Sequence, residues 1–231
     1  KTRMAEISFS QLAIAFIPVV GVMAILFKWQ IGFGAASYGL LRMLGQLLLV
    51  GYFLTFIFES GNAWLVVGVL AVMIGAASWI ALGALPDKRK QLLSSALLSV
   101  LVGGGFTLVV ITQAVLQIDP WFAPKILLPL AGMIFASAMN SVSLAGERFY
   151  SEIANGHDFE QARASSFRAS MIPVINSLFA VGLVSLPGMM TGQILAGVSP
   201  LIAARYQIVV MCMIFGASGL SSALFLSRQK L

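Results

Sequence analysis

The sequence has very few of the residues that soluble proteins use for catalysis or metal binding. Its 231 residues include one cysteine, Cys212, and one histidine, His157. A single cysteine excludes an intrachain disulfide, and Cys212 has no neighbours at metal-ligand spacing. One histidine in a polar stretch does not supply a catalytic triad, and no phosphate-binding loop is present. These absences argue against an enzyme and predict that the chain itself carries no cofactor.

Charge is also scarce, since only 10% of the residues are charged while 59% are hydrophobic. Such a chain has too little polar surface to cover a water-soluble globule. The net charge of +6 does not indicate nucleic-acid binding, because the basic residues lie in the gaps between apolar runs. The acids are expected in water at the ends of those runs, which argues against a proton relay. They are Glu6, Glu59, Asp87, Asp119, Glu147, Glu152, Asp158 and Glu160.

What the sequence does contain is a series of long apolar runs. A membrane-spanning helix needs about 20 mostly apolar residues. The windows that meet this requirement are 8–27, 38–58, 63–85, 92–116, 126–146, 170–194 and 203–227. Their length and the lack of two-residue alternation exclude a β-barrel. We therefore predict an all-α polytopic membrane protein with about seven transmembrane helices, forming one membrane domain over residues 1–231.

The basic residues predict how this domain is oriented, because lysine and arginine are enriched on the cytoplasmic side of membrane proteins. Ten lie on one side of the predicted spans and four on the other. The first group is Lys28, Arg42, Lys88, Arg89, Lys90, Arg148, Arg163, Arg168, Arg228 and Lys230; the second is Lys1, Arg3, Lys125 and Arg205. The N-terminus is expected outside, and the C-terminus and the polar loop 147–168 in the cytoplasm.

Polar side chains inside the spans cost free energy unless they find partners. Arg42 and Gln46 lie one helical turn apart in the second span. Arg42 either finds a partner within the protein or snorkels to the membrane surface. Asn140, Ser143 and Glu147 share one side of the fifth span, which predicts that this side faces protein or a substrate path.

The sixth window contains residues that weaken a helix. Pro187 lacks a backbone donor, and Gly188 and Gly192 lower helix propensity, so carbonyls in residues 184–188 are expected to be freed. A broken helix that binds substrate and a simple packed kink are both consistent with this pattern. The methionines near this region offer either soft metal ligands or adaptable core packing. They are Met133, Met139, Met189, Met190, Met211 and Met213.

Several segments of the C-terminal half together resemble one protein family. Residues 139–149 are MNSVSLAGERF, residues 172–177 are IPVINS, residues 181–192 are VGLVSLPGMMTG and residues 205–211 are RYQIVVM. These segments resemble the FetB (YbbM) family of ABC transporter permeases. The N-terminal half resembles that family mainly in hydropathy and in Arg42, Gln46 and Leu47. One departure is the loop after Arg148, which lacks an acidic helical stretch that the family usually has.

The resemblance implies a permease in the inner (plasma) membrane that dimerises and docks on cytoplasmic ATP-binding subunits. It further implies iron export in bacteria and aluminium tolerance in plants, with ATP and Mg²⁺ held by the partner subunit. We expect a substrate path lined by Asn140, Ser143, Asn176, Ser177, Met189, Met190 and Gln193. Coupling to the ATP-binding subunit is expected at Glu147, Arg148, Glu152, Arg163 and Arg168.

Two alternatives stay open at the level of sequence. One is a membrane scaffold or receptor-like subunit that recruits a cytoplasmic partner and moves no substrate. The other is a permease for a non-metal substrate such as a UDP-sugar, because amides and thioethers are compatible with either kind of cargo. Membrane lipids are expected partners in every case.

Overall fold

The computed structural model describes residues 8–229 and is helical throughout those residues, apart from short turns and one isolated bridge between Val181 and Ser185. This confirms the predicted all-α polytopic class. The chain divides into two compact units, Lys1–Ser60 and Gly61–Leu231. We describe each by itself, and the single domain over residues 1–231 stays a prediction.

The first unit is a helical hairpin with a short leading helix. It consists of α1 (Phe9–Ile14), α2 (Ile17–Trp29) and α3 (Phe33–Ser60). Ser8 begins α1 with a capping box in which its hydroxyl accepts from the Gln11 amide. Phe27 and Phe33 pack edge to face across the turn between α2 and α3, with ring centroids 5.5 Å apart. Arg42 and Gln46 are both exposed on α3.

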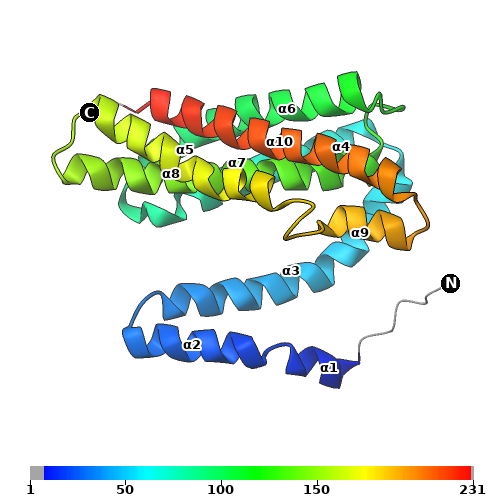
Figure 1. Ribbon diagram of the computed structural model, residues 1–231, viewed down its shortest axis with the longest axis horizontal. Helices are drawn as coiled ribbons and strands as arrows, with labels where there is room; N and C mark the ends of the chain where they lie inside the picture. Colours follow the sequence, from blue (N-terminus) through cyan, green and yellow to red (C-terminus); the bar gives the residue numbers. More distant parts are fainter. Residues whose placement is uncertain (1–7, 230–231) are drawn as a thin grey trace. The chain divides into compact units, whose positions relative to one another are not determined.

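The second unit is a bundle in which α7 contacts α4, α8 and α10 (Figure 1). Its elements are α4 (Ala63–Ala81), η1 (Leu82–Ala84), η2 (Pro86–Lys88), α5 (Arg89–Ser99), η3 (Val100–Gly104), α6 (Gly105–Val109), η4 (Val110–Val115), α7 (Pro124–Ala154), α8 (Phe159–Ala180), α9 (Gly188–Leu195) and α10 (Pro200–Ser227). The segments η3 and η4 are π-helical. They interrupt the α-helical pattern within one predicted span.

Six helical segments in the described part of the chain are long and apolar enough to cross a membrane. They are Ser10–Trp29, Phe33–Glu59, Ala63–Ala84, Pro86–Val115, Pro124–Ala154 and Pro200–Ser227. Each overlaps one of the predicted windows. The remaining window, 170–194, is present as the pair α8 and α9 with a non-helical stretch between them.

Small residues let helices of the second unit approach closely. A Cβ built on Gly103 would lie 2.6 Å from the backbone nitrogen of Ser221 on α10. A Cβ on Gly104 would lie 3.0 Å from the Phe135 ring. Gly75 on α4 differs, because its Cβ would meet nothing within 4 Å among the described residues. Close packing therefore accounts for the glycines of η3, as expected where lipid gives no hydrophobic drive for association.

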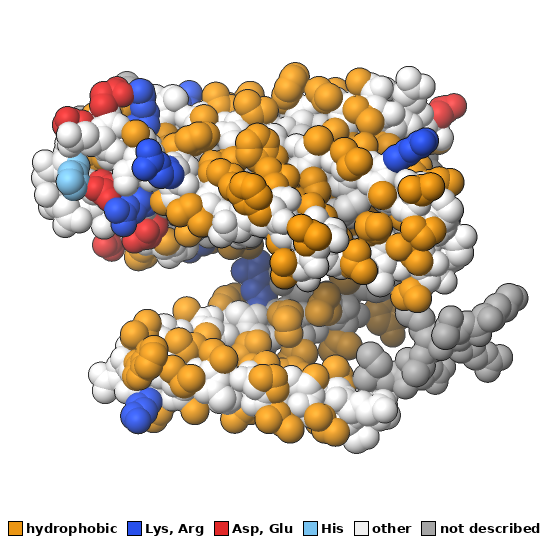
Figure 2. Space-filling view, in the orientation of Figure 1, with side chains coloured by type: hydrophobic (Ala, Val, Ile, Leu, Met, Phe, Trp, Pro, Cys, Tyr) orange, Lys and Arg blue, Asp and Glu red, His pale blue; other side chains and the backbone are white. Residues whose placement is uncertain are grey.

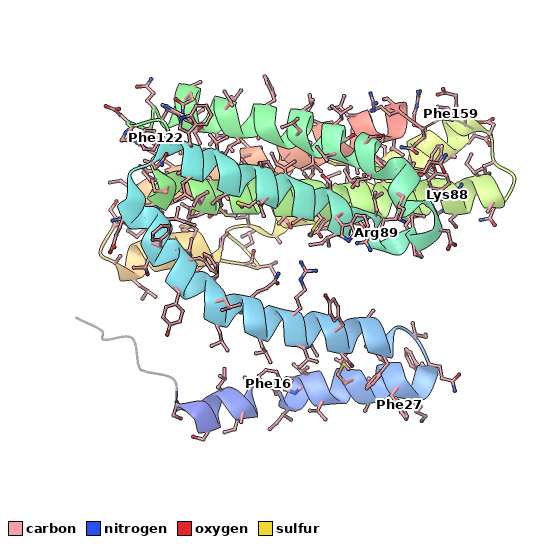
Figure 3. All side chains as sticks on the ribbon, turned by 180° about the vertical axis from the view of Figure 1, so that it is seen from behind. Phe16, Phe27, Lys88, Arg89, Phe122 and Phe159 are labelled. Atoms are coloured by element: carbon pink, nitrogen blue, oxygen red, sulfur yellow. The ribbon has the colours of Figure 1, made fainter. Side chains whose placement is uncertain are left out.

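Charged side chains of the second unit gather at the end that holds the α7–α8 turn, while hydrophobic side chains cover much of the rest of the visible face (Figure 2). Lys88, Arg89 and Phe159 lie at this end and Phe122 at the other (Figure 3). The Lys88 ammonium lies 4.0 Å from the centre of the Tyr150 ring. We call this end of the second unit the charged end.

The prediction that residues 147–168 form a loop was wrong about their secondary structure. Helix α7 continues to Ala154 and α8 begins at Phe159, so the turn between them contains only residues 155–158. Hydropathy marked where the apolar side chains end, whereas a helix continues as long as its backbone hydrogen bonds do. The side chain of Asp158 caps α8 by accepting from the Gln161 amide at 2.8 Å. This segment is a helical hairpin.

Candidate functional site

The interruption between α8 and α9 begins after Ala180 and contains Gly182. This residue has φ +83°, a left-handed conformation that glycine adopts without strain. The carbonyl of Ala180 accepts from the amides of Val184 at 2.8 Å and Ser185 at 3.1 Å, and the Gly182 amide donates to Ser185 at 2.9 Å. The break is therefore an ordered turn with its own backbone hydrogen bonds.

Of the two possibilities that the sequence left open, a broken helix and a packed kink, the structure contains the broken helix. The non-helical stretch overlaps residues 184–188, where freed carbonyls were expected, but it begins earlier because helix α8 already ends at Ala180. Pro187 instead precedes α9 as its N-cap residue. Pro173 lies inside α8 without ending it. The turn therefore depends on Gly182 in its left-handed conformation and not on Pro187, because α8 has already ended before Pro187.

A groove of about 460 Å³ lies beside this turn. Its lining comes from the end of α8, the turn, α9 and one face of α10. The lining residues are Leu178, Val181, Gly182, Met190, Ala204, Gln207, Ile208, Met211, Cys212 and Phe215. The groove is mostly apolar, with one amide and three sulfur-bearing side chains among those residues.

Gln207 is the polar side chain most deeply buried in this groove. It is only 5% exposed, and its Oε1 has no hydrogen-bond partner within residues 8–229. On α9, Oε1 of Gln193 is likewise buried without a partner in the described part of the chain. Burying an amide without a partner costs about 1–3 kcal/mol. Two such groups close to one helix break indicate a polar contact that the isolated chain does not make.

The predicted path residues are spread over three helices and only Met190 among them lines the groove. Asn140 is exposed on α7, and Ser143 on the same helix is half-buried. Asn176 and Ser177 are exposed on α8, where the Ser177 hydroxyl donates to the Pro173 carbonyl at 2.9 Å. Met189 is exposed, and Met190 and Gln193 are half-buried.

Sequence reasoning missed Gln207 and Met211 as groove residues, although both lie in a segment that carried the family resemblance. A signal was present, since Gln207 and Met211 are four residues apart on α10 and share a helix face. Cys212 lies beside them in the sequence, with an exposed free thiol. That face lines a groove only because the turn and α9 lie against it.

At the charged end, Glu152 joins three of its neighbours. Its carboxylate forms an ion pair with Arg148 and lies 3.1 Å from Nε2 of His157. The Ser165 hydroxyl on α8 donates to Glu152 at 3.4 Å. Glu152 is only 7% exposed, so the prediction that every acid lies in water was wrong for this residue. Partners from α7, the turn and α8 offset the cost of burying its charge.

The remaining predicted coupling residues have different surroundings. Glu147 and Arg168 are exposed. Arg163 forms an ion pair with Glu160 and lies over the Phe159 ring, 5.7 Å from its centre. The α7–α8 hairpin is stabilised by an apolar cluster from α7, α8 and α10. The cluster consists of Ala145, Phe149, Ala162 and Leu226.

No group of three or more His, Cys, Asp or Glu side chains comes together as a metal site within residues 8–229. This part of the chain therefore offers no carboxylate or imidazole cage of the kind that hard and borderline metal ions prefer. Any metal contact at the groove has to come from thioether, thiol and amide groups.

Comparisons with known proteins support the resemblance found in the sequence. Residues 9–230 match the Uncharacterised protein family (UPF0014). The UPF0014 membrane protein slr1647 of Synechocystis is 38% identical over 88% of this chain and 85% of its own length. The probable iron export permease protein FetB of Escherichia coli is 36% identical over 82% of this chain and 78% of its own length.

A plant relative extends the comparison beyond bacteria. The protein ALUMINUM SENSITIVE 3 of Arabidopsis thaliana is 32% identical over 82% of this chain and 73% of its own length. No solved structure matches the chain. Because the family match covers almost all of the described helices, the chain belongs to the UPF0014 family of membrane proteins, which includes a relative named as a permease.

Proposed function

We propose that this chain is the membrane subunit of an ABC-type transporter that exports a metal ion, iron in the first instance, with ATP hydrolysed by a separate cytoplasmic subunit. The observation that carries the proposal is the ordered helix break between α8 and α9 in a member of a family that includes a named iron export permease. Interrupted helices are a recurrent way of building substrate sites in membrane transporters.

Exposed amides support a second copy of the chain as a partner. Asn140 and Asn176 are exposed on α7 and α8, where a lipid neighbour would leave their hydrogen-bonding groups unpaired. A second protomer that covers these helices would pair them and enclose a path between the two copies. Met189, Met190 and Gln193 on α9 would then face the same path. In this arrangement the subunit works as a dimer.

The charged hairpin supports coupling to the ATP-binding subunit. It exposes Glu147 and Arg168, while Glu152 holds its two helices together. We propose that this end lies in the cytoplasm, where a partner that binds ATP and Mg²⁺ docks on the exposed charges. Rocking of the hairpin would then shift the bundle between inward-open and outward-open states, provided that the partner contacts the two states differently.

ATP hydrolysis by the reconstituted complex tests this function. The chain is co-purified with its candidate ATP-binding partner in lipid vesicles and titrated with Fe²⁺, other metal ions and UDP-sugars. We expect Fe²⁺ to stimulate hydrolysis, and the stimulation to disappear when the partner's ATP site is disabled. Stimulation by a UDP-sugar alone would overturn the metal substrate. No complex and no stimulation would favour a scaffold.

The proposed path is tested by the double variant Asn176→Ala and Met189→Ala. Removing an amide and a thioether that each contribute a contact of about 1 kcal/mol is expected to lower Fe²⁺-stimulated hydrolysis and efflux by about thirtyfold. Ser94→Ala, an exposed position on α5, is the matched control. Full stimulation and efflux in the double variant would show that these side chains do not line the path.

A further inference from the structure

The structure separates the methionines into different environments. Met213 is fully buried, so it acts as core packing. Met190 from α9 and Met211 from α10 instead line the groove, together with the free thiol of Cys212. Three sulfur-bearing residues from two helices therefore line one groove. Thioether and thiolate sulfurs are soft ligands, which select soft metal ions.

A second, independent observation points to a missing polar contact in the same groove. Gln207 is only 5% exposed and lines the cavity, and its Oε1 finds no hydrogen-bond partner anywhere in residues 8–229. Buried amides without a partner are rare, because desolvation without a new bond costs free energy. A positively charged ligand in the groove would be stabilised by this oxygen and by the sulfur atoms of Met190, Met211 and Cys212.

We propose that the groove between the α8–α9 turn and α10 binds a soft monovalent metal ion, with Cys212, Met190 and Met211 as ligands and the Gln207 oxygen as a weaker fourth contact. Cu⁺ is the physiological ion of this class and Ag⁺ is its redox-inert probe. The inference goes beyond the proposed iron export, because it concerns binding by this subunit alone and a different class of metal ion.

Charge balance favours a monovalent ion over a divalent one. When the ion binds, the S–H bond of Cys212 breaks, its proton passes to water, and a sulfur–metal bond forms with no change of oxidation state. One thiolate with one monovalent cation gives a neutral complex. A divalent ion with the same ligands would leave a net positive charge in an apolar groove within the membrane, which is costly.

Competition titration of the full-length chain in lipid nanodiscs tests the site. Cu⁺ is supplied with a chromophoric chelator under reducing conditions, and Ag⁺, Fe²⁺ and Zn²⁺ are compared. We expect one Cu⁺ or Ag⁺ per chain, with release of one proton, and no matching affinity for Fe²⁺ or Zn²⁺. Cys212→Ser should weaken binding by about 100-fold or more, and Met190→Leu and Met211→Leu by about tenfold each. The control Met133→Leu, a methionine outside the groove, should bind as the unaltered chain does.

Gln207→Leu provides a readout that a purely structural residue would not give. Removing the unpaired buried oxygen is expected to raise the thermal stability of the metal-free chain while weakening Cu⁺ binding several-fold. Equal Cu⁺ affinity in the unaltered chain and in a folded Cys212→Ser variant would overturn the site, as would Fe²⁺ binding as tightly as Cu⁺. Iron-stimulated ATP hydrolysis is measured separately in the reconstituted complex, so either proposal can fail while the other stands.

Discussion

The carboxylate of Glu152, near the end of α7, lies 3.1 Å from Nε2 of His157 in the turn that leads to α8. Arg148 pairs with the same carboxylate from one helical turn earlier, and Ser165 reaches it from α8. One buried acid thus joins both helices of the hairpin and the turn between them. These contacts connect the end of α7, the turn and the first part of α8.

Replacing Glu152 should loosen the hairpin. In Glu152→Gln the partners Arg148 and His157 lose their anionic acceptor, and we expect a loss of about 1–2 kcal/mol, since both partners are half exposed to solvent. For a chain of this size that corresponds to roughly 2–8 °C in the midpoint of thermal unfolding. The midpoint can be followed by size-exclusion chromatography of heated, detergent-solubilised protein.

The matched control for this variant is Glu160→Gln, which removes an acid whose ion pair with Arg163 is exposed. Surface pairs of this kind contribute about 0–1 kcal/mol, so little change is expected. Equal midpoints for the two variants would contradict the fastening role of Glu152.

Gly103→Ala should destabilise the second unit. Its Cβ would lie 2.6 Å from the Ser221 backbone nitrogen, so η3 and α10 would have to separate. Overpacking of this kind costs about 1–3 kcal/mol. In Gly75→Ala the new methyl group meets nothing within 4 Å among the described residues, and higher helix propensity should leave stability equal or slightly greater. Thermal unfolding of both variants, side by side, distinguishes close packing from mere helix flexibility.

Gly182→Ala should strain the turn between α8 and α9. Gly182 has φ +83°, and a left-handed conformation costs an alanine roughly 1–2 kcal/mol. We expect lower transport in the reconstituted complex, with protein still recovered as a folded species. Gly188→Ala is the control, because its Cβ has open space in the described structure and Gly188 begins α9 without a positive φ. A loss of transport with Gly188→Ala alone would mean that the left-handed turn is not the critical element.

The proposed orientation is testable by thiol labelling. In a Cys212→Ser background, Lys90→Cys and Lys125→Cys place single thiols at exposed positions on opposite sides of the predicted membrane. A membrane-impermeant maleimide should label the thiol at 125 on intact cells and the thiol at 90 only after permeabilisation. The reverse pattern would put the charged end outside. The background without an added cysteine reports any non-specific labelling.

Apolar runs in the sequence were enough to predict most helical segments. A run long enough to cross the bilayer has to be helical, because in lipid a helix satisfies the backbone hydrogen bonds of its own segment. The charged hairpin was less predictable. Hydropathy ended the fifth window at residue 146, yet α7 continues to Ala154 because helical hydrogen bonds do not depend on apolar side chains. Glu152 was therefore expected in water, whereas packing of α7 against α8 buries it.

The candidate site shows the same division between local and long-range information. Pro187, Gly188 and Gly192 predicted a weakened helix and left a break and a kink both open, whereas the left-handed turn at Gly182 was not predicted, because residue type alone does not show which glycine adopts a positive φ.

By itself, the sequence determined the membrane class, the positions of most apolar spanning segments and the family, since these depend on local composition and short motifs. Only the tertiary structure decided which side chains share a cavity. Met190 on α9 and Gln207 on α10 line one groove because the chain turns back after α9 and packs α9 against α10. Contacts between separate helices depend on the geometry of the connection that joins them, and hydrophobic periodicity does not encode that geometry.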